Sequence, residues 1–292
     1  QGLFPALLTP FSKNGETVLY DRACALADRL AKQGVAGLFP AGTTGEGMLM
    51  TLDERKTLLE EIVKAVGKKV KVIAHTGCLD TASTIELTRH AMKIGAAAAG
   101  IVTPGFYGYD EDALFRHYKL VAGAVKGFPV FLYNIPGCAK NALSPQFVLR
   151  VAHSIDNDIG LKDSAGVIQN LSLVIDGAPK GFTVLNGVDE YTYQAMLTGA
   201  NGSVTSTANV VPELFLKVHR AVWAGDLKTA RAAQTKLDTA CSLFQYGKMV
   251  AYYKEGLRLR GFDAGCVRPP QRELTAAEKK AFAKALEIAG LI

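Results

Sequence analysis

The sequence lacks paired cysteines and closely spaced metal ligands. Its five cysteines stand far apart and form no Cys-x-x-Cys pair: Cys24, Cys78, Cys138, Cys241 and Cys266. They indicate neither a disulfide framework nor a zinc site, and they fit a reducing cytoplasm. Four of the five histidines fall within helical segments without ligand spacing: His90, His117, His153 and His219. We therefore expect no metal ion, and no other cofactor is indicated.

Long apolar runs and blocks of like charge are also missing. No run approaches the roughly 18 residues that a membrane span needs, and no secretory signal is visible at the N-terminus. The formal net charge of +6 comes from lysines and arginines spread along the chain. This distribution favours a mild attraction for anionic substrates over nucleic-acid binding. We expect a cytoplasmic protein without a membrane or nucleic-acid partner.

Apolar strands alternate with amphipathic helices over most of the chain. The pattern predicts strands at 2–8, 37–41, 70–75, 98–102, 130–133, 159–162, 183–186 and 203–205. Helices are predicted at 19–33, 52–66, 81–94, 111–125, 144–153, 167–177, 189–198 and 211–223. Uniformly apolar strands joined by helices require a parallel sheet covered on both faces. Eight units in a row, without the Gly-x-Gly-x-x-Gly of a dinucleotide-binding fold, favour a (β/α)8 TIM barrel.

Three more helical segments follow the eighth unit, near 226–245, 248–260 and 275–289. They predict a C-terminal helical extension. We therefore divide the chain into a barrel catalytic domain at 1–223 and an extension at 224–292.

In such a barrel the active site lies at the C-terminal ends of the strands. The predicted ends carry hydroxyls, glycines, one lysine and one tyrosine: Thr9, Gly42–Gly47, His75–Gly77, Thr103–Tyr107, Tyr133–Pro136, Lys162–Ser164, Gly187–Glu190 and Thr205–Thr207. The loop 42–47 suits a carboxylate, because it offers amide and hydroxyl donors. It also suits a plain strand-to-helix turn that uses glycines for close packing. Asp189 and Glu190 fit either a helix start or the binding of substrate hydroxyls.

Lys162 stands at the end of a short apolar strand, after Ile159 and Leu161. If this strand enters a core, the lysine loses hydration, and desolvation disfavours its charged form. A lysine that deprotonates near neutral pH is the usual route to a Schiff base with a ketone. The alternative is a strand-end lysine whose ammonium reaches the surface. Tyr133 likewise fits either a proton carrier or a core aromatic residue with a satisfied hydroxyl.

Three motifs narrow these alternatives by their order and spacing: Gly42-Thr-Thr-Gly-Glu46, Tyr133-Asn-Ile-Pro136 and Gly160-Leu-Lys-Asp163. Together they resemble the pyruvate-dependent class I aldolase superfamily, which contains dihydrodipicolinate synthase and N-acetylneuraminate lyase. The similarity runs from Leu3 to the C-terminal helices. The resemblance implies a TIM barrel with a helical extension, assembled as a homotetramer that is a dimer of dimers.

The resemblance also implies roles for individual residues. Lys162 would form the Schiff base with the ketone of pyruvate or another 2-oxo acid, and Tyr133 would relay protons. Thr43 and Thr44, with the amides of the loop that begins at Gly42, would hold the substrate carboxylate, and Thr44 would join the relay. The resulting iminium is an electron sink, so a carbon–carbon bond can break or form without a metal.

The choice of branch depends on two further positions. In the synthase branch, an arginine two residues after the proline of the tyrosine motif grips the aldehyde's carboxylate, and here that position is Cys138. A cysteine cannot supply the bidentate donors of arginine, and the nearby Lys140 would have to reach differently. The stretch Asn186-Gly-Val-Asp-Glu190 resembles the lyase branch, where its counterpart binds the hydroxylated tail of sialic acid. The substrate-binding candidates on this side are Gly187, Asp189, Glu190, Ser164 and Ser206.

We therefore expect an aldolase that acts on a 2-oxo-3-deoxy sugar acid, of the N-acetylneuraminate or 2-keto-3-deoxy-gluconate type. A sugar-acid dehydratase, dihydrodipicolinate synthase and a non-enzymatic barrel that binds a 2-oxo acid are the alternatives. One position departs from the family pattern. The tyrosine that the family contributes across a dimer interface falls on Phe106, so the adjacent Tyr107 becomes the candidate substrate contact.

Overall fold

The strands form a closed ring of eight parallel strands. The computed structural model describes residues 1–292, except for the side chains of Asp158 and Tyr246. The strands are β1 (Gly2–Pro5), β2 (Gly37–Leu38), β3 (Lys71–His75), β4 (Ala98–Val102), β5 (Val130–Asn134), β6 (Asp158–Asp163), β7 (Thr183–Asn186) and β8 (Gly202–Thr205). Their order is β1-β8-β7-β6-β5-β4-β3-β2. Backbone hydrogen bonds close the ring, since Ala36 N–H donates to Leu3 O and Phe39 N–H to Pro5 O, each at 2.9 Å.

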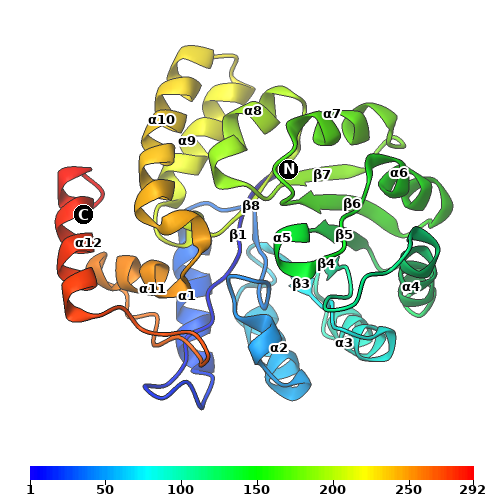
Figure 1. Ribbon diagram of the computed structural model, residues 1–292, viewed down its shortest axis with the longest axis horizontal. Coiled ribbons are helices and arrows are strands. Elements are labelled where there is room, and N and C mark those ends of the chain that lie inside the picture. Colours follow the sequence, from blue (N-terminus) through cyan, green and yellow to red (C-terminus); the bar gives the residue numbers. More distant parts are fainter.

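Helices surround this ring (Figure 1). The longer ones are α1 (Tyr20–Lys32), α2 (Leu52–Val66), α3 (Thr81–Lys93), α4 (Glu111–Gly123), α6 (Pro145–Ser154), α7 (Ile168–Gly177), α9 (Pro212–Trp223), α10 (Leu227–Leu243), α11 (Val250–Leu259) and α12 (Ala276–Ile288). The short ones are α5 (Pro136–Ala139), α8 (Thr192–Leu197), η1 (Gly47–Leu49), η2 (Asp189–Tyr191), η3 (Thr207–Asn209) and η4 (Gln245–Gly247). The predicted (β/α)8 TIM barrel with a C-terminal helical extension is confirmed.

Element boundaries differ from the prediction where the backbone leaves the extended conformation. β2 ends at Leu38 instead of Ala41, because Pro40 has no N–H to donate and Ala41 has a φ of 58°. β1 ends at Pro5 instead of Leu8. The predicted helix at 189–198 is divided into η2 and α8. The helix α5 was not predicted, although Pro136 stands at its first turn, where proline is favoured.

The apolar core has two layers, one on each side of the sheet. The larger layer packs the strands against the helices, with Leu38, Leu132 and Leu161 among its buried members. The smaller layer fills the inside of the barrel: Phe4, Ala6, Phe39, Ile73, Ala98, Val102, Phe131, Tyr133, Ala139, Leu185 and Val204. Side chains of alternate strand positions point to opposite faces, which is why neighbouring residues of one strand enter different layers. Among the helices that the structure describes, none is long and apolar enough to cross a membrane.

A buried ion pair attaches the C-terminal extension to the loop after β2. Lys254, on α11, donates to the carboxylate of Glu46 at 2.7 Å and to the carbonyl oxygen of Thr9 at 2.8 Å. The second oxygen of Glu46 accepts from the backbone N–H of Arg268 at 2.8 Å. Glu46 has a left-handed φ of 55°, so this loop turns sharply just after Thr43 and Thr44. The extension therefore fixes the loop that carries both threonines.

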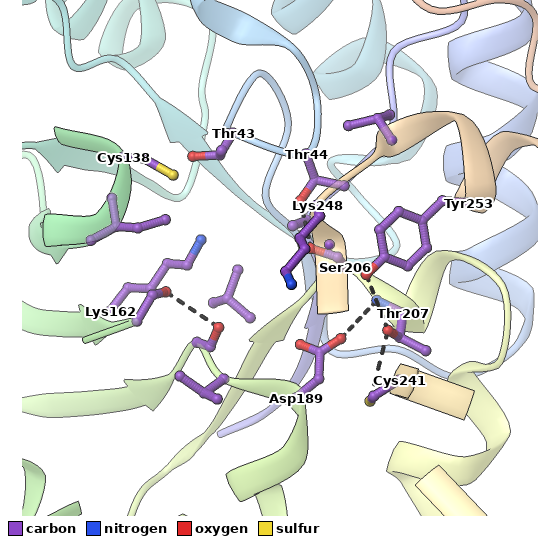
Figure 2. A pocket seen from close by; sticks show the side chains of 18 of the residues that line it. Thr43, Thr44, Cys138, Lys162, Asp189, Ser206, Thr207, Cys241, Lys248 and Tyr253 are labelled. Atoms are coloured by element: carbon purple, nitrogen blue, oxygen red, sulfur yellow. Dashed lines mark hydrogen bonds between the residues drawn. The ribbon is translucent and has the colours of Figure 1, made fainter. Parts of the chain in front are cut away.

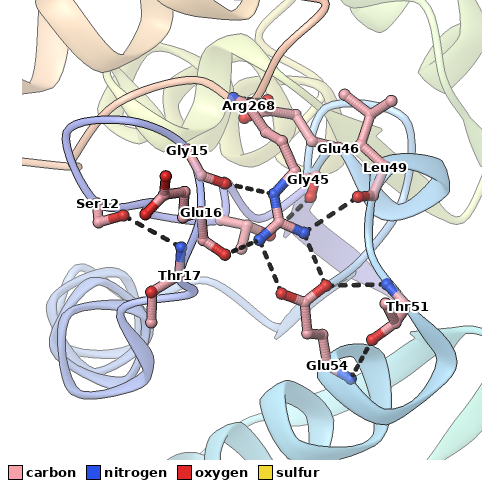
Figure 3. Close-up of polar contacts among 11 residues, drawn as sticks. Ser12, Gly15, Glu16, Thr17, Gly45, Glu46, Leu49, Thr51, Glu54 and Arg268 are labelled. Carbon is pink, nitrogen blue, oxygen red and sulfur yellow. Dashed lines mark hydrogen bonds and ion pairs between the residues drawn. The ribbon is translucent and has the colours of Figure 1, made fainter.

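Arg268 adds a contact to the loop after β2 and extends the attachment to two other segments (Figure 3). Its guanidinium donates to both carboxylate oxygens of Glu54 at 2.7 Å. It also donates to the carbonyl oxygens of Gly15 at 2.6 Å, Glu16 at 2.9 Å and Leu49 at 3.0 Å. One arginine thus connects the first β–α loop, the second β–α loop and the start of α2.

Burial works against the charged forms of the Glu46–Lys254 pair. It raises the pKa of the Glu46 carboxyl and lowers the pKa of the Lys254 ammonium, although each attracts the other. Both pKa shifts favour the uncharged form, so for each residue desolvation outweighs the attraction between the two charges. A pair of this kind contributes little net stability over an uncharged replacement, but removing one partner leaves an uncompensated buried charge.

We predict that Lys254→Met lowers the free energy of unfolding by about 3–5 kcal/mol, because the Glu46 carboxylate is left buried without its cation. Urea denaturation at pH 7 measures the effect. The matched control is Lys284→Met on the exposed side of α12, with an expected change within about 0.5 kcal/mol. The double variant Glu46→Gln/Lys254→Met should recover part of the loss. A single-variant cost below about 1 kcal/mol would contradict the role of the pair.

Candidate active site

A cavity of about 540 Å³ opens at the C-terminal ends of the strands. Its volume lies within the range of sites for small molecules. Side chains from β5, β6 and the loops after β2, β7 and β8 line it, and the C-terminal extension adds others (Figure 2). The lining includes Thr43, Thr44, Tyr133, Cys138, Lys162, Ser164, Gly187, Asp189, Glu190, Ser206, Thr207, Cys241, Lys248, Tyr253 and Gln271.

Lys162 enters the cavity from β6, directly beside Tyr133 on β5. The two residues are register partners in the parallel ladder. Lys162 is 4% exposed, so the predicted burial of this lysine is confirmed. Its ammonium nitrogen lies 3.8 Å from the ring centre of Tyr133 and 4.3 Å from that of Phe39. The amine is therefore held between two aromatic faces inside the barrel mouth.

Gly160 provides the space beneath this lysine. A Cβ at this position would lie 2.3 Å from the ring of Phe131, a distance that side-chain atoms do not reach. The aromatic ring therefore fills the barrel where a side chain on Gly160 would otherwise stand. The neighbouring Leu161 points the other way and packs in the outer layer.

Two pairs of hydroxyls line the cavity near Lys162. The Tyr133 and Thr43 oxygens are 3.3 Å apart, and the Thr44 and Ser206 oxygens are 2.6 Å apart. Tyr133 is therefore bonded to Thr43, whereas the proposed relay partner Thr44 is bonded to Ser206. The hydrogen bond between Thr43 and Tyr133 connects the loop after β2 to the wall of the cavity that contains Lys162. The role of Thr44 in proton transfer stays a prediction.

The wall after β7 carries a buried carboxylate. Asp189 accepts from the backbone N–H of Thr207 at 2.9 Å. Burial raises the pKa of Asp189 to about 6, and the hydrogen bonds from Thr207 offset only part of that effect. Gly187 is needed beside it, because a Cβ there would lie 2.0 Å from the hydroxyl oxygen of Ser164. This hydroxyl donates to the carbonyl oxygen of Gly187 at 3.3 Å.

Behind Tyr133 lies His75, the last residue of β3. Its ring meets the ring of Tyr133 edge-on, with centroids 5.9 Å apart. Its Nδ1 is 3.2 Å from an Arg55 guanidinium nitrogen, which can only donate. Burial and the charges of Arg55 and Lys162 hold the pKa of His75 well below its usual range. His75 is thus a neutral support for Tyr133.

Two predicted substrate-binding residues lie outside this cavity. The carbonyl oxygen of Gly42 accepts from Gly47 N–H at 3.1 Å, so Gly42 shapes the turn. Tyr107 is 64% exposed, and its ring packs edge-on against those of Phe106 and Tyr109. Phe106 adopts a φ of 70°, and the loop turns outward. The sequence placed the contact of this loop with substrate across a dimer interface, so the role of Tyr107 stays a prediction. Lys140 also lies outside the cavity lining.

Comparison with known proteins agrees with this geometry. The model of the dihydrodipicolinate synthetase family matches residues 1–289. The chain is 36% identical to the 4-hydroxy-tetrahydrodipicolinate synthase of an Exiguobacterium species over 287 residues, covering 98% of this chain and 97% of the relative. It is 35% identical to an uncharacterized DapA-like lyase of Halobacterium salinarum over 291 residues, covering 100% and 94%.

A solved structure extends the agreement to three dimensions. YagE, a prophage protein of the dihydrodipicolinic acid synthase family from E. coli K12 in complex with pyruvate, superposes with a TM-score of 0.95. It is 30% identical, and the match covers 100% of this chain and 99% of that chain. The chain belongs to the dihydrodipicolinate synthetase family. It is therefore a carbon–carbon lyase of the class I pyruvate-dependent aldolase type.

The sequence did not predict the part of the cavity wall that comes from the C-terminal extension. Cys241, Lys248, Tyr253 and Gln271 all line the cavity. The hydroxyl oxygen of Tyr253 lies 3.4 Å from that of Thr207, which connects the extension to the loop after β8. Helical periodicity predicted helices at 226–245 and 248–260, but it does not indicate that side chains of these helices, or Gln271 in the loop after them, reach the ends of the strands.

We predict that Asp189→Asn stabilises the enzyme at pH 8 but not at pH 4. The folded-state pKa of Asp189, about 6, lies above its ordinary value of 3.8. Its ionisation therefore costs stability as the pH rises between these two values, and the neutral amide avoids that cost. We expect a gain of about 2 kcal/mol at pH 8 from urea denaturation. The control is Asp176→Asn on the exposed side of α7, and equal effects of the two substitutions at pH 8 would refute the prediction.

Proposed function

We propose that this enzyme is a Schiff-base-forming aldolase that cleaves or condenses a 2-oxo-3-deoxy sugar acid, to or from pyruvate and an aldehyde. The sugar acid is of the N-acetylneuraminate or 2-keto-3-deoxy-gluconate type. One observation carries this choice: Asp189 and Glu190 line the same cavity as Lys162. Carboxylates accept hydrogen bonds from hydroxyl groups, and a sugar acid carries several hydroxyls along its chain.

In the cleavage direction, the Lys162 amine attacks the C2 ketone of the substrate, and loss of water gives an iminium. A base removes the proton of the C4 hydroxyl, the C3–C4 bond breaks and its electron pair moves into the iminium. This step releases the aldehyde and leaves the enamine of pyruvate on Lys162. Protonation of the enamine at C3 and hydrolysis of the imine then release pyruvate and restore the amine.

Tyr133 is the proposed proton carrier in these steps. Its ring lies against the Lys162 nitrogen, and its hydroxyl is bonded to Thr43. A proton carrier must lie within hydrogen-bond reach of the reacting atoms, either directly or through one water molecule. Thr43 and Thr44 would hold the substrate carboxylate, and Ser164, Gly187 and Ser206 would border the hydroxylated part. The iminium supplies the electron sink, so the proposal needs no metal ion or other cofactor.

A second candidate is 4-hydroxy-tetrahydrodipicolinate synthase, which joins pyruvate and aspartate semialdehyde. The names of several relatives favour it, among them the protein from the Exiguobacterium species. The lining of the cavity argues against it, because Cys138 stands where the synthase branch has its carboxylate-binding arginine. A cysteine thiol is at most a weak donor and carries no fixed positive charge.

The experiment combines a covalent trap with a substrate panel. Borohydride reduction in the presence of pyruvate should add the mass of a reduced pyruvate imine to the peptide of Lys162, and Lys162→Ala should show no adduct. The panel contains N-acetylneuraminate, 2-oxo-3-deoxy-gluconate and 4-hydroxy-2-oxoglutarate in the cleavage direction, and aspartate semialdehyde with pyruvate in the condensing direction. Asp189→Ala should lower sugar-acid turnover by about 10- to 100-fold while the pyruvate adduct still forms.

Three outcomes would overturn parts of this proposal. A label on another lysine would refute the Schiff-base assignment. Aspartate semialdehyde as the best partner would favour the synthase over the sugar-acid lyase. Turnover of a sugar acid without release of pyruvate would identify the dehydratase alternative, in which the iminium assists loss of water.

We also propose that the enzyme is a homotetramer, built as a dimer of dimers. The exposed rings of Phe106, Tyr107 and Tyr109 contact one another on the surface, and exposed apolar clusters are typical of protein interfaces. We predict a mass of four chains by light scattering coupled to size exclusion, and a smaller assembly for the double variant Phe106→Ser/Tyr107→Ser. A monomeric native enzyme would refute this proposal.

A further inference from the structure

The cavity contains a second cation, Lys248, that the reaction described above does not use. This residue follows η4, in the turn between α10 and α11. Figure 2 shows its side chain reaching from the extension toward the space between Lys162 and Asp189. The ion pairs among the described side chains do not include Lys248. Its ammonium is therefore available to a ligand in the cavity.

The turn that carries Lys248 is sharply defined. Gln245 and Gly247 adopt left-handed φ values of 57° and 77°, and Lys248 N–H donates to Gln245 O at 3.1 Å. The following helix α11 holds the buried Lys254, which is bound to Glu46. Lys248 is thus attached to the same element that anchors the loop of Thr43 and Thr44.

The other basic groups near the cavity are already engaged. Lys162 becomes part of the imine when the 2-oxo acid binds. Lys140 is exposed, and its ammonium lies 3.5 Å from the carbonyl oxygen of Phe106, outside the cavity lining. The Arg268 guanidinium is bound to Glu54 and to backbone carbonyls. Among the described residues that line the cavity, Lys248 is therefore the cation that remains for the part of the substrate remote from the imine.

We propose that Lys248 binds a second anionic group, a carboxylate or a phosphate, at the end of the aldehyde substrate remote from its carbonyl. This inference rests on the proposed aldolase function and narrows its substrate class to 2-oxo-3-deoxy sugar acids whose aldehyde half carries a carboxylate or a phosphate. The aldehyde halves of N-acetylneuraminate and 2-keto-3-deoxy-gluconate are themselves uncharged. An anionic group in this part of the cavity would be repelled by the carboxylates of Asp189 and Glu190, and a cation offsets that repulsion. Those carboxylates then accept hydrogen bonds from hydroxyls between the two ends of the substrate. Cys138 is uncharged where the synthase branch has an arginine, so this part of the cavity lining offers no second cation for the anionic group.

The test uses three aldehydes that share the same reacting carbonyl and adjacent hydroxyl. Glyceraldehyde has a neutral end, tartronate semialdehyde ends in a carboxylate, and glyceraldehyde 3-phosphate ends in a phosphate. Condensation with saturating pyruvate gives kcat/KM for each aldehyde. We expect one anionic aldehyde to exceed glyceraldehyde by about 10- to 100-fold, since a hydrogen bond to a charged group contributes to this extent. The preferred aldehyde distinguishes a carboxylate site from a phosphate site.

Variants assign the preference to Lys248. Lys248→Gln should reduce the ratio of anionic to neutral aldehyde to near one, whereas Lys248→Arg should keep most of it. Lys140→Gln is the matched control outside the cavity and should keep the native ratio. Native enzyme that uses all three aldehydes equally, or a Lys248→Gln variant that keeps the native ratio, would overturn the inference and leave the aldolase proposal standing. A pyruvate adduct without condensation of any aldehyde would overturn the aldolase proposal itself, and the role of Lys248 with it.

Discussion

The buried contact between Glu46 and Lys254 is the constraint on which the geometry of the cavity depends. Glu46 ends the loop that carries Thr43 and Thr44, and Lys254 lies on α11, the helix that begins two residues after Lys248. Burial disfavours the charged forms of both partners, so the pair does little for net stability. Its effect is positional, because each charge has its hydrogen-bond partners in one arrangement only. The C-terminal extension is therefore a wall of the active site as well as a cover for the barrel.

The opposite wall follows from the register of parallel strands. Lys162 and Tyr133 are direct partners across β5 and β6, so no loop has to bring the proposed nucleophile and the proposed proton carrier together. Phe39 and Phe131 fill the barrel beneath them, and Gly160 leaves the room that Phe131 needs. A lysine fixed between aromatic faces loses little further conformational entropy when it forms an imine. The rigid part of the site is therefore the part to which the proposed mechanism assigns imine formation and proton transfer.

The sequence predicted the elements that have their own periodic signal. The bounds of β4, β7 and α2 were predicted to the residue, because the apolar run of each strand and the helical periodicity of α2 stop sharply at their ends. Gly42 and Tyr107 were placed in the site by family resemblance. Neither lines the cavity within one chain, since Gly42 shapes the turn before Thr43 and Tyr107 lies exposed on the surface. The contact of Tyr107 across a dimer interface stays a prediction. Lys248 and Tyr253 carried no signal, because helical periodicity identifies a buried face without identifying what that face meets.

The cavity has one part around Lys162 and another around the remainder of the substrate. A substrate therefore cannot be assigned to this chain from the names of its relatives alone. In the proposed reaction, the motifs around Thr43, Tyr133 and Lys162 serve the imine chemistry, which does not depend on the aldehyde. The residues around the rest of the substrate, Cys138, Asp189 and Lys248, are not needed for that chemistry and can change independently. The cavity joins two carboxylates on one wall to an unpaired ammonium on another. That arrangement is best matched by a substrate that carries both hydroxyl groups and a second negative charge.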